Sequence, residues 1–479
     1  MNLNKLEEKE LKILRNAVDK ASEQSASQIA QSDKVKNIMA IVEKFLYDKK
    51  LICYGGIAIN NILPLKDQFY NRYVDVPDYD FFSPNALNDA MKLADIYYKK
   101  GYSNVQAKTG IHEGTFKVYV DFLQVADITQ IPKKLFNNLK KDSVSVYGIL
   151  YAPVNFLRMS MYLELSRPKG DVSRWEKVLK RLILLNKNYP IKYENCEKKL
   201  NIDNKNKKYN ENLFNVIKDT AINTELVFFG SYAVYLYSKY MPNYIKKKFK
   251  KTLDFNILSN NPLKSVILIK ERLNENGFNN VKYYKKRGIG EIIPEHYEIK
   301  VNNNTVGFIY KTFACHNYNK INLGDKIVKV ATIDTILSLY FAFMYGDRSY
   351  YDVKKLTCIT QFLFIVQYEN RLNQKGLLKR FVLSCYGKQE SMDDKRLYKS
   401  EQYNLLKDKR DSYEFKKLFL KYYPEQSKSK NKTKNVKNNK TKNVTFKIKN
   451  KTKSKNKNKN KTKSKSKSNN ILNKIIKIL

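Results

Sequence analysis

The sequence predicts a mixed α/β protein in which one α/β unit occurs twice in tandem. Short apolar runs end at turn residues and are followed by helical periodicity, the pattern of strand, turn and helix. Four segments of the first half recur in the same order in the second half. Hydrophobic residues make up 42% of the 479 residues, which is enough for a sizeable core and excludes a wholly disordered chain.

The chain divides into five predicted parts. They are, in order, an N-terminal helical region (1–48), a first α/β domain (49–190), a linker (191–220), a second α/β domain (221–425) and a Lys/Asn-rich tail (426–479). The tail lacks core-forming residues over most of its length, so we expect it to be disordered.

The first elements follow from spacing and punctuation. Residues 5–30 have apolar side chains at helical spacing, and Ser32 can cap a second helix that runs to about residue 50. The run LICYGG (51–56) stops at two glycines, which is typical of a strand that ends in a tight turn. A short helix follows, and Pro64 ends it.

The rest of the first unit alternates strands and helices. VPDYDFFSP (76–84) reads as a strand, and the next helix is closed by Gly101. GTFKVYV and LQVADIT read as two strands joined by a tight turn at Asp121-Phe122. The pattern is helical again over residues 153–187.

The internal repeat aligns four segments. Residues 115–129 align without a gap to 296–310, and the other segments keep the same order. The paired positions are Gly55 with Gly230, Gly56 with Ser231, Asp78 with Asp254, Asp80 with Asn256, and Asp127 with Phe308. The second copy has therefore lost two of the three acids of the first.

The acids of the first copy predict a metal site. Asp78 and Asp80 are two residues apart on a predicted strand, so both carboxylates lie on one face, and Asp127 ends a strand that can lie alongside. Three converging carboxylates without a lysine or arginine between them would repel unless divalent cations neutralise them. Oxygen ligands favour two Mg²⁺ or Mn²⁺ ions, which can assist an in-line phosphoryl displacement. Asp121 is the alternative third acid, but the repeat places it in the hairpin turn, which favours Asp127.

Two further groups can hold phosphates. Gly55 and Gly56 lie between a strand and a helix, where bare backbone N–H groups can bind triphosphate oxygens. Arg167, Arg174 and Lys177 lie on a basic helical stretch and can reach the triphosphate or an RNA backbone, although a solvated basic surface explains them equally well.

The composition also excludes several classes. No run approaches the ~18 apolar residues of a membrane span, and the polar start MNLNKLEEKE is unlike a secretory signal. Five scattered cysteines and three histidines argue against a disulfide framework and a structural zinc site. We therefore expect a reducing compartment and no disulfides.

The net charge of +45 has two parts. Residues 426–479 contain 20 lysines and no acid or arginine, so subtracting 20 from +45 leaves +25 on the first 425 residues. A basic body favours a polyanion, nucleic acid first, although an AT-rich genome would also enrich lysine. The tail can bind RNA through counterion release or be a tolerated extension.

The turn, the D-x-D strand and the third acid resemble the DNA polymerase β-like nucleotidyltransferase superfamily. Longer segments resemble the poly(A) polymerase catalytic subunits of large nucleocytoplasmic DNA viruses of the poxvirus and giant-virus type. These segments are CYGGIAINNILP, VPDYDFFSPNAL, HEGTFKVYVDFLQVADIT and ELSRPKGDVSRWEKVLKRL, and the resemblance covers about residues 35–365.

This resemblance implies a catalytic nucleotidyltransferase domain followed by a degenerate copy. The implied activity is template-independent transfer of AMP from ATP to mRNA 3′ ends, with Mg²⁺ or Mn²⁺. By position, Gly55 and Gly56 match the phosphate turn, Asp78 and Asp80 the metal pair, and Asp127 the third acid. The superfamily often has serine at the second turn position, so Gly56 is a departure that removes a hydroxyl contact.

The resemblance also bears on partners and location. RNA and ATP are implied, with no membrane, in the host cytoplasm at the viral factory or packaged in the virion. Some relatives form homodimers, and the poxvirus relatives use a cap methyltransferase as processivity factor; the basic charge favours a self-sufficient enzyme. Two alternatives remain open. One is a non-catalytic RNA-binding subunit on the same scaffold, and the other is a terminal nucleotidyltransferase of the CCA-adding or oligoadenylate type.

Overall fold

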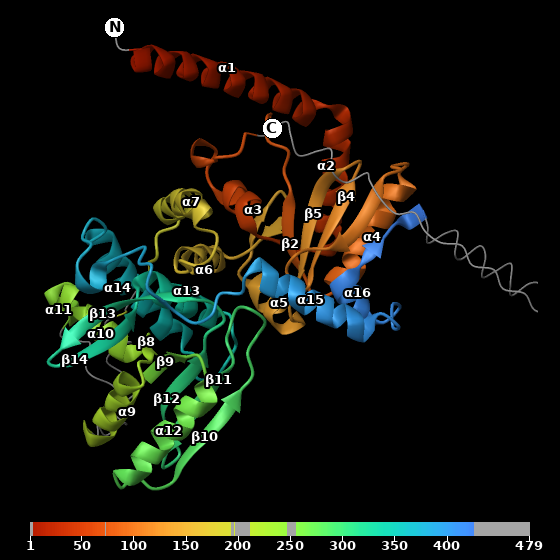
Figure 1. Ribbon diagram of the computed structural model, residues 1–479. Helices are drawn as coiled ribbons and strands as arrows, with labels where there is room; N and C mark the ends of the chain where they lie inside the picture. The colour runs from red at the N-terminus through yellow and green to blue at the C-terminus, as the bar shows by residue number, and fades with distance from the viewer. Residues whose placement is uncertain (1–2, 72, 193–195, 197–210, 247–254, 426–479) are drawn as a thin grey trace, which may run out of the picture. The chain divides into compact units, whose positions relative to one another are not determined.

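The computed structural model describes residues 3–425 apart from 72, 193–195, 197–210 and 247–254. The predicted disorder of the tail, most of the predicted linker and Asp254 therefore lie outside the described residues. The α/β fold class is confirmed, because the described part contains two eight-stranded sheets with helices packed on them (Figure 1).

Two helices open the described chain, as the apolar spacing predicts. They are α1 (Leu3–Gln31) and α2 (Asp33–Lys49). The Ser32 hydroxyl accepts a hydrogen bond from the Val35 backbone N–H at 3.3 Å, so Ser32 caps α2 as expected. Although α1 is long, neither it nor any other described helix combines the length and the apolar character that crossing a bilayer requires.

The first sheet has the order β16-β3-β4-β5-β2-β1-β7-β6. Its strands are β1 (Ile52–Cys53), β2 (Tyr79–Ser83), β3 (Val105–Thr109), β4 (Thr115–Val120), β5 (Leu123–Gln130), β6 (Val144–Val146), β7 (Ile149–Tyr151) and β16 (Lys421–Tyr422). The central strands are largely buried, and Ile52, Cys53 and Phe81 have no exposed surface. The middle of the sheet is therefore the core of the first half.

Helices connect and cover these strands. They are α3 (Gly55–Ile62), α4 (Ala86–Lys99), α5 (Lys133–Lys141), α6 (Val154–Leu165) and α7 (Trp175–Asn188), with 3₁₀ turns at Leu65–Asp67 and Val172–Arg174. Helix α3 ends before Pro64, as expected. Gly101, with φ +97°, follows the end of α4 in the left-handed conformation that favours glycine.

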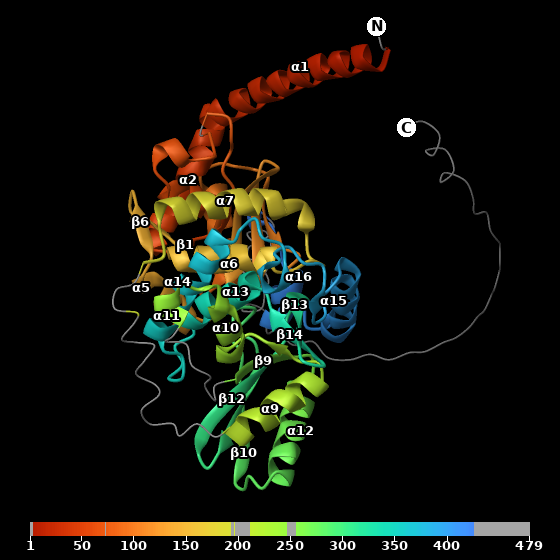
Figure 2. The ribbon, with the colours of Figure 1, turned by 90° about the vertical axis from the view of Figure 1, so that its left-hand side faces the viewer.

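The second sheet repeats seven strands of the first in the same order. Its order is β10-β11-β12-β9-β8-β14-β13-β15, in which β10 to β13 take the places of β3 to β6, whereas β15 and β16 are edge strands without a counterpart. Strands β9, β10 and β12 of this sheet are seen in the lower part of Figure 2. The strands are β8 (Val227–Phe228), β9 (Phe255–Ser259), β10 (Val281–Lys286), β11 (His296–Val301), β12 (Asn304–Lys311), β13 (His316–Leu323), β14 (Lys326–Ala331) and β15 (Cys385–Tyr386). The helices of this half are α9 (Glu211–Asn223), α10 (Ser231–Tyr237), α11 (Asn243–Lys246), α12 (Pro262–Glu275), α13 (Ile333–Met344) and α14 (Val353–Glu369).

The aligned hairpins share their local geometry. Asp121-Phe122 has φ values of 47° and 68°, and Asn302-Asn303 has 49° and 64°. The pairing register also shifts at matching positions, between residues 118 and 119 in the first hairpin and between 299 and 300 in the second. Two turns and two bulges at equivalent places confirm that the second half is a copy of the first.

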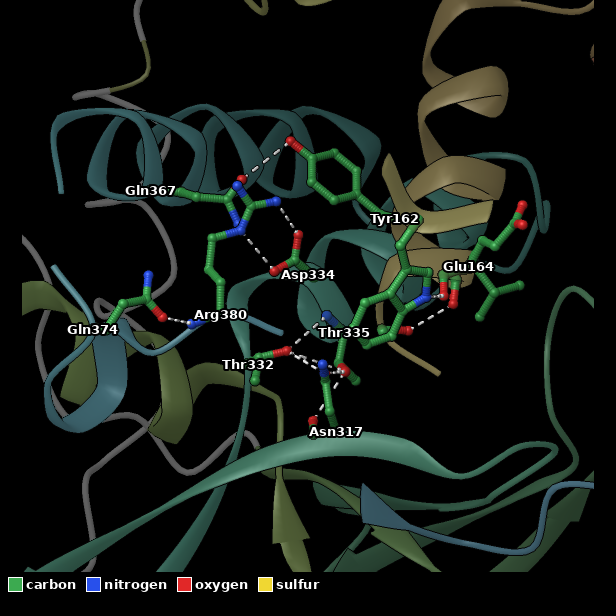
Figure 3. Close-up of polar contacts among 12 residues, drawn as sticks. Tyr162, Glu164, Asn317, Thr332, Asp334, Thr335, Gln367, Gln374 and Arg380 are labelled. Atoms are coloured by element: carbon green, nitrogen blue, oxygen red, sulfur yellow. Dashed lines mark hydrogen bonds and ion pairs between the residues drawn. The ribbon is translucent and has the colours of Figure 1, made fainter. Parts of the chain in front are cut away.

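Helices α6 and α13 pack against each other and join the two halves. Beside this contact lies a buried ion pair of the second half (Figure 3). Arg380 donates from Nη2 and Nε to the two carboxylate oxygens of Asp334, at 2.6 and 3.0 Å. The Tyr162 hydroxyl of α6 donates to Gln367 of α14 at 3.4 Å, and this hydrogen bond links the first half to the second.

The C-terminal segment returns to the first half. It contains a 3₁₀ turn (Gly376–Leu378), α15 (Met392–Leu406) and α16 (Tyr413–Phe419) before β16, which pairs antiparallel with β3. Ser391 and Asp394 form a capping box at the start of α15. These residues fall in the range predicted for the second domain, and the predicted domain boundaries stay predictions.

The expectation that the chain contains no disulfide is wrong. The structure pairs Cys196 with Cys358 and Cys315 with Cys385, and Cys53 is buried and unpaired. The pairs are 162 and 70 residues apart in sequence, and folding brings their Cα atoms to 5.3 and 5.2 Å. The spacing of cysteines along the chain could not reveal such distant pairs.

Candidate active site

The first sheet brings the three predicted acids together. Strands β2 and β5 are parallel neighbours, and their register places Asp80 directly opposite Asp127. Asp78 precedes β2 by one residue and, by the two-residue period of a strand, lies on the same face as Asp80. The predicted carboxylate cluster is therefore present in the fold.

The carboxylates perturb one another. Burial, with the charges of Asp78 and Asp127, raises the pKa of Asp80 from 3.8 to about 7. Burial and the charge of Asp127 also raise the pKa of Asp78. The cluster therefore stores electrostatic repulsion that a cation would relieve.

Two neighbours hold the carboxylates, and one of them corrects an expectation. The sequence pattern suggested acids without a basic residue among them, but Lys117 Nζ lies 2.7 Å from Asp127 Oδ2. Strand β4 places Lys117 directly opposite Asp127. Gln124 donates to Asp78 Oδ2 at 2.8 Å.

The two glycines form a close turn over the acids. Gly55 has φ +74°, and a side-chain carbon there would overlap the Asp80 carboxylate. A side-chain carbon on Gly56 would lie 2.6 Å from the Tyr70 hydroxyl and 3.0 Å from Arg181 Nη1. The turn at the start of α3 therefore needs small residues, because the Asp80 carboxylate lies against Gly55 and the Arg181 guanidinium lies against Gly56.

One cavity of about 1180 Å³ contains most of the predicted site. The predicted residues that line it are Gly55, Gly56, Asp78, Asp80, Asp127, Arg174 and Lys177. Arg181 lines the same cavity, and its Nη2 donates to the Tyr70 hydroxyl at 2.7 Å. Basic side chains from α7 and its 3₁₀ turn therefore face the acids of the sheet across the cavity.

The three predicted basic residues differ in their surroundings. Arg174 Nε lies 3.1 Å from Glu164 Oε1, and its side chain is 56% exposed. Arg167 is not among the residues that line the cavity. Its guanidinium carbon lies 5.2 Å from the centre of the Phe313 ring, and burial lowers its pKa to about 10. Arg167 therefore lies towards the second half.

The alternative third acid is separated from the cluster. Asp121 occupies the hairpin turn with φ 47° and forms an ion pair with Lys34 at 2.7 Å. It does not line the cavity that Asp127 lines. The placement favours Asp127 over Asp121 as the third acid.

The donor set fits a divalent cation. No set of three or more Asp, Glu, His or Cys side chains among the described residues is preassembled as a metal site. However, Oδ1 of Asp127 is buried and has no hydrogen-bond partner among the described residues. A buried, unpaired carboxylate oxygen beside two further acids is suited to Mg²⁺ or Mn²⁺.

The second half keeps the close glycine turn of this site and lacks its opposed carboxylates. Asn256 lies opposite Phe308, as Asp80 lies opposite Asp127 in the first half. A side-chain carbon on Gly230 would lie 2.5 Å from the Asn256 backbone nitrogen. The close turn is conserved between the copies, whereas the pair of opposed carboxylates is not.

Sequence reasoning missed three residues of the cavity region, namely Lys117, Tyr70 and Arg181. Counting back from the hairpin turn without a bulge pairs Lys117 with Ala126, on the other face from Asp127. The register shift after Val118 corrects this pairing, and no residue type in the hairpin signals it. Arg181 follows Lys177 by four residues on α7, so helical spacing could have suggested it.

Comparisons with known proteins agree with the motifs. Residues 40–171 match the family model of the poly(A) polymerase catalytic subunit. A protein of Acanthamoeba polyphaga mimivirus named as a poly(A) polymerase catalytic subunit is 34% identical over 194 residues, which is 40% of this chain and 32% of that protein. A protein of the same name from African swine fever virus is 36% identical over 168 residues, which is 34% of this chain and 35% of that protein.

The matched segments span about a third of the length of these curated relatives. Over nearly the whole chain the fold is similar to the crystal structure of the Megavirus polyadenylate synthase, with a TM-score of 0.74 and 20% identity, covering 91% of this chain and 89% of that one. The chain therefore has an α/β fold with a duplicated unit, of which only the first copy carries the opposed carboxylates. The resemblance of residues 40–171 to viral poly(A) polymerase catalytic subunits is confirmed.

Proposed function

We propose that the protein is a template-independent polynucleotide adenylyltransferase that adds AMP from ATP to RNA 3′ ends. One observation supports this most directly. Asp80 and Asp127 lie opposite each other on β2 and β5, beside the close turn at Gly55, and one Asp127 oxygen is buried without a partner. The choice of adenine rests on the names of the relatives, whereas the transfer chemistry is argued from this geometry.

In this proposal Asp78, Asp80 and Asp127 would hold two divalent cations. Bound there, the cations would neutralise charge on the phosphates while the RNA 3′-hydroxyl attacks the α-phosphate of ATP, the bond to the β-phosphate breaks and pyrophosphate leaves. The backbone N–H groups at the start of α3 can bind triphosphate oxygens, because the Gly55 turn leaves them uncovered. Arg181 and Lys177 face the same cavity and can offset the triphosphate charge.

The test is an extension assay with the full chain, a single-stranded RNA primer, Mg²⁺ or Mn²⁺ and each of the four nucleotides in turn. We expect long tails with ATP only. Asp78→Asn and Asp80→Asn should each lower incorporation by about 10³-fold, a loss typical of removing an electrostatic contact to the transition state. Their RNA affinity should change little, because these acids serve the metal.

Asp127→Asn and Asp121→Asn are a matched pair of variants. Asp127→Asn should reduce activity as Asp80→Asn does. Asp121→Asn removes the same charge from the same hairpin but lies outside the cavity, so it should retain activity. The opposite result would move the third acid to Asp121.

The same assay separates the two alternative functions. Short or 2′-linked products would favour a CCA-adding or oligoadenylate-type enzyme. No extension by the wild-type chain with any nucleotide and either metal would favour a non-catalytic RNA-binding subunit. A homodimer, a cap-methyltransferase-type processivity factor, and a location in the viral factory or the virion stay predictions.

A further inference from the structure

Two distant parts of the chain, helix α15 and the loop between β3 and β4, contact each other. His112 of this loop lines the cavity of the candidate active site. Lys395 of α15 places its Nζ 3.3 Å from His112 Nδ1, and Lys399 Nζ donates to the Gly110 carbonyl at 2.9 Å. Helix α15 therefore places two ammonium groups at the edge of the cavity.

The charges at this place are not balanced. Neither Lys395 nor Lys399 forms an ion pair with an acid among the described residues, although the charge of Glu113, which is itself paired with Lys417, acts on Lys399. Arg167 is the third cation, and its buried Nε has no hydrogen-bond partner among them either. We call Arg167, Lys395 and Lys399 the cationic cluster.

The acids and the titration of this region agree with an excess of positive charge. Glu113 forms an ion pair with Lys417, in which Oε1 and Nζ are 2.5 Å apart. Glu291 is the acid whose charge acts on His112. Burial lowers the pKa of His112, and Lys395, Arg167 and Lys399 lower it further. Three cations therefore surround a histidine that favours its neutral form. A bound anion would reduce the repulsion among these cations.

The same face of α15 adds an aromatic ring. Lys395, Tyr398 and Lys399 are spaced i, i+3 and i+4, so they share one face of the helix. Tyr398 is 44% exposed. Alternating cations and aromatic rings are typical of surfaces that bind single-stranded nucleic acid, through phosphate contacts and base stacking.

The chain itself limits the distance from this surface to the acids. His112 precedes Lys117 by five residues, and Lys117 contacts Asp127. Five residues of chain span at most about 17 Å, so a strand whose 3′ end lies at the acids reaches the cluster within a few nucleotides. The cavity that His112 and the acids share connects the two places.

We propose that the cationic cluster, with His112 and Tyr398, binds phosphodiesters of single-stranded RNA a few nucleotides upstream of the 3′ end. This inference rests on the proposed function for the identity of the strand. The same phosphate chemistry occurs in the triphosphate of ATP, which the test distinguishes.

The test measures binding of a fluorescein-labelled 20-nucleotide single-stranded RNA to the full chain by anisotropy, without ATP or metal, from 0.05 to 0.4 M salt. Lys395→Gln/Lys399→Gln should reduce the slope of log affinity against log salt by about 1.4, because each phosphate contact to a single strand contributes about 0.7. At 0.1 M salt this slope corresponds to a loss of roughly 25-fold. The KM for ATP at saturating RNA should stay unchanged.

The matched control is Lys407→Gln/Lys409→Gln, which removes the same charge just beyond the end of α15. It should lose little affinity. Lys395→Gln alone, which leaves the Lys399 contact to the loop intact, should lose about fivefold and keep the thermal midpoint of the wild type. This single variant keeps the test decisive if the double variant does not fold.

Two results would overturn the inference. One is an RNA affinity of the cluster variants equal to that of the control. The other is a raised KM for ATP with unchanged RNA affinity, which would assign the cluster to the triphosphate. Because the binding assay contains no ATP, a chain that binds RNA through the cluster but incorporates no AMP would refute the proposed activity alone.

Discussion

Replacing Asp80 with asparagine should stabilise the metal-free protein at pH 8 while it abolishes AMP transfer. The reason is that Asp80 is ionised among two other carboxylates in a half-buried position. The amide keeps the shape of the carboxyl group and removes its charge. If Asp80 instead stabilised the fold, its replacement by asparagine would lower the stability of the protein.

The magnitude follows from the pKa of Asp80. Its value rises from 3.8 to about 7 in the folded protein, so the fold favours the protonated form. Below about pH 4 both states are protonated and there is no penalty. As the pH rises from about 4 to 7 the unfolded state ionises before the folded state does, so the folded protein loses stability, and the loss is complete above pH 7. Three pKa units correspond to about 4 kcal/mol, and Asp80→Asn should recover up to about that amount above pH 7.

The assay is thermal denaturation in EDTA at pH 4.5 and pH 8. We expect a higher midpoint for Asp80→Asn than for wild type at pH 8, and a much smaller difference at pH 4.5. Added Mn²⁺ should raise the midpoint of the wild type and affect the variant less. Equal or lower stability of Asp80→Asn at pH 8, or a gain that does not shrink at low pH, would refute the reasoning.

Three further predictions concern the turn, the lysine and the interface. Gly55→Ala should abolish extension and lower the free energy of unfolding by about 1–2 kcal/mol, because residue 55 has a positive φ. Gly56→Ala should retain more activity, because its side-chain carbon would meet only the flexible ends of two side chains. Extension rates and thermal melting of both variants check this. Lys117→Met should lower the metal-free melting midpoint and enlarge the increase caused by Mn²⁺, and an unchanged response to Mn²⁺ would contradict the placement of this lysine on a metal ligand. Arg380→Gln should destabilise by about 3–5 kcal/mol in urea because Asp334 is left buried without a partner, and adding Asp334→Asn should restore part of the loss.

Much of the fold could be predicted from local pattern. The turn at Asp121-Phe122, the cap at Ser32 and the end of α3 before Pro64 depend on nearby residues only, and all three are as expected. The repeat added long-range information, because a gapless alignment of two hairpins implies equal turns and equal registers. It also favoured Asp127 over Asp121 as the third acid, because the aligned turn positions hold Asp121.

The surroundings of the acids could not be predicted in the same way. Lys117 contacts Asp127 because a bulge shifts the register of β4 and β5 by one residue, and a one-residue shift moves every side chain to the other face. Arg167 was expected to reach the triphosphate or an RNA backbone, and the structure places it against Phe313, outside the lining of the cavity. The return of β16 to the first sheet depends on pairing with an edge strand more than 300 residues earlier.

The sequence by itself determined the α/β class, the duplication, and the acids and glycines of the first copy, because turn residues, two-residue strand periods and aligned segments are local properties. Only the tertiary structure decided which charges meet. It paired Lys117 with Asp127, brought Lys395 to His112 and joined cysteines 162 residues apart. These contacts depend on strand register and on packing between the halves, and neither is encoded in the spacing of residues along the chain.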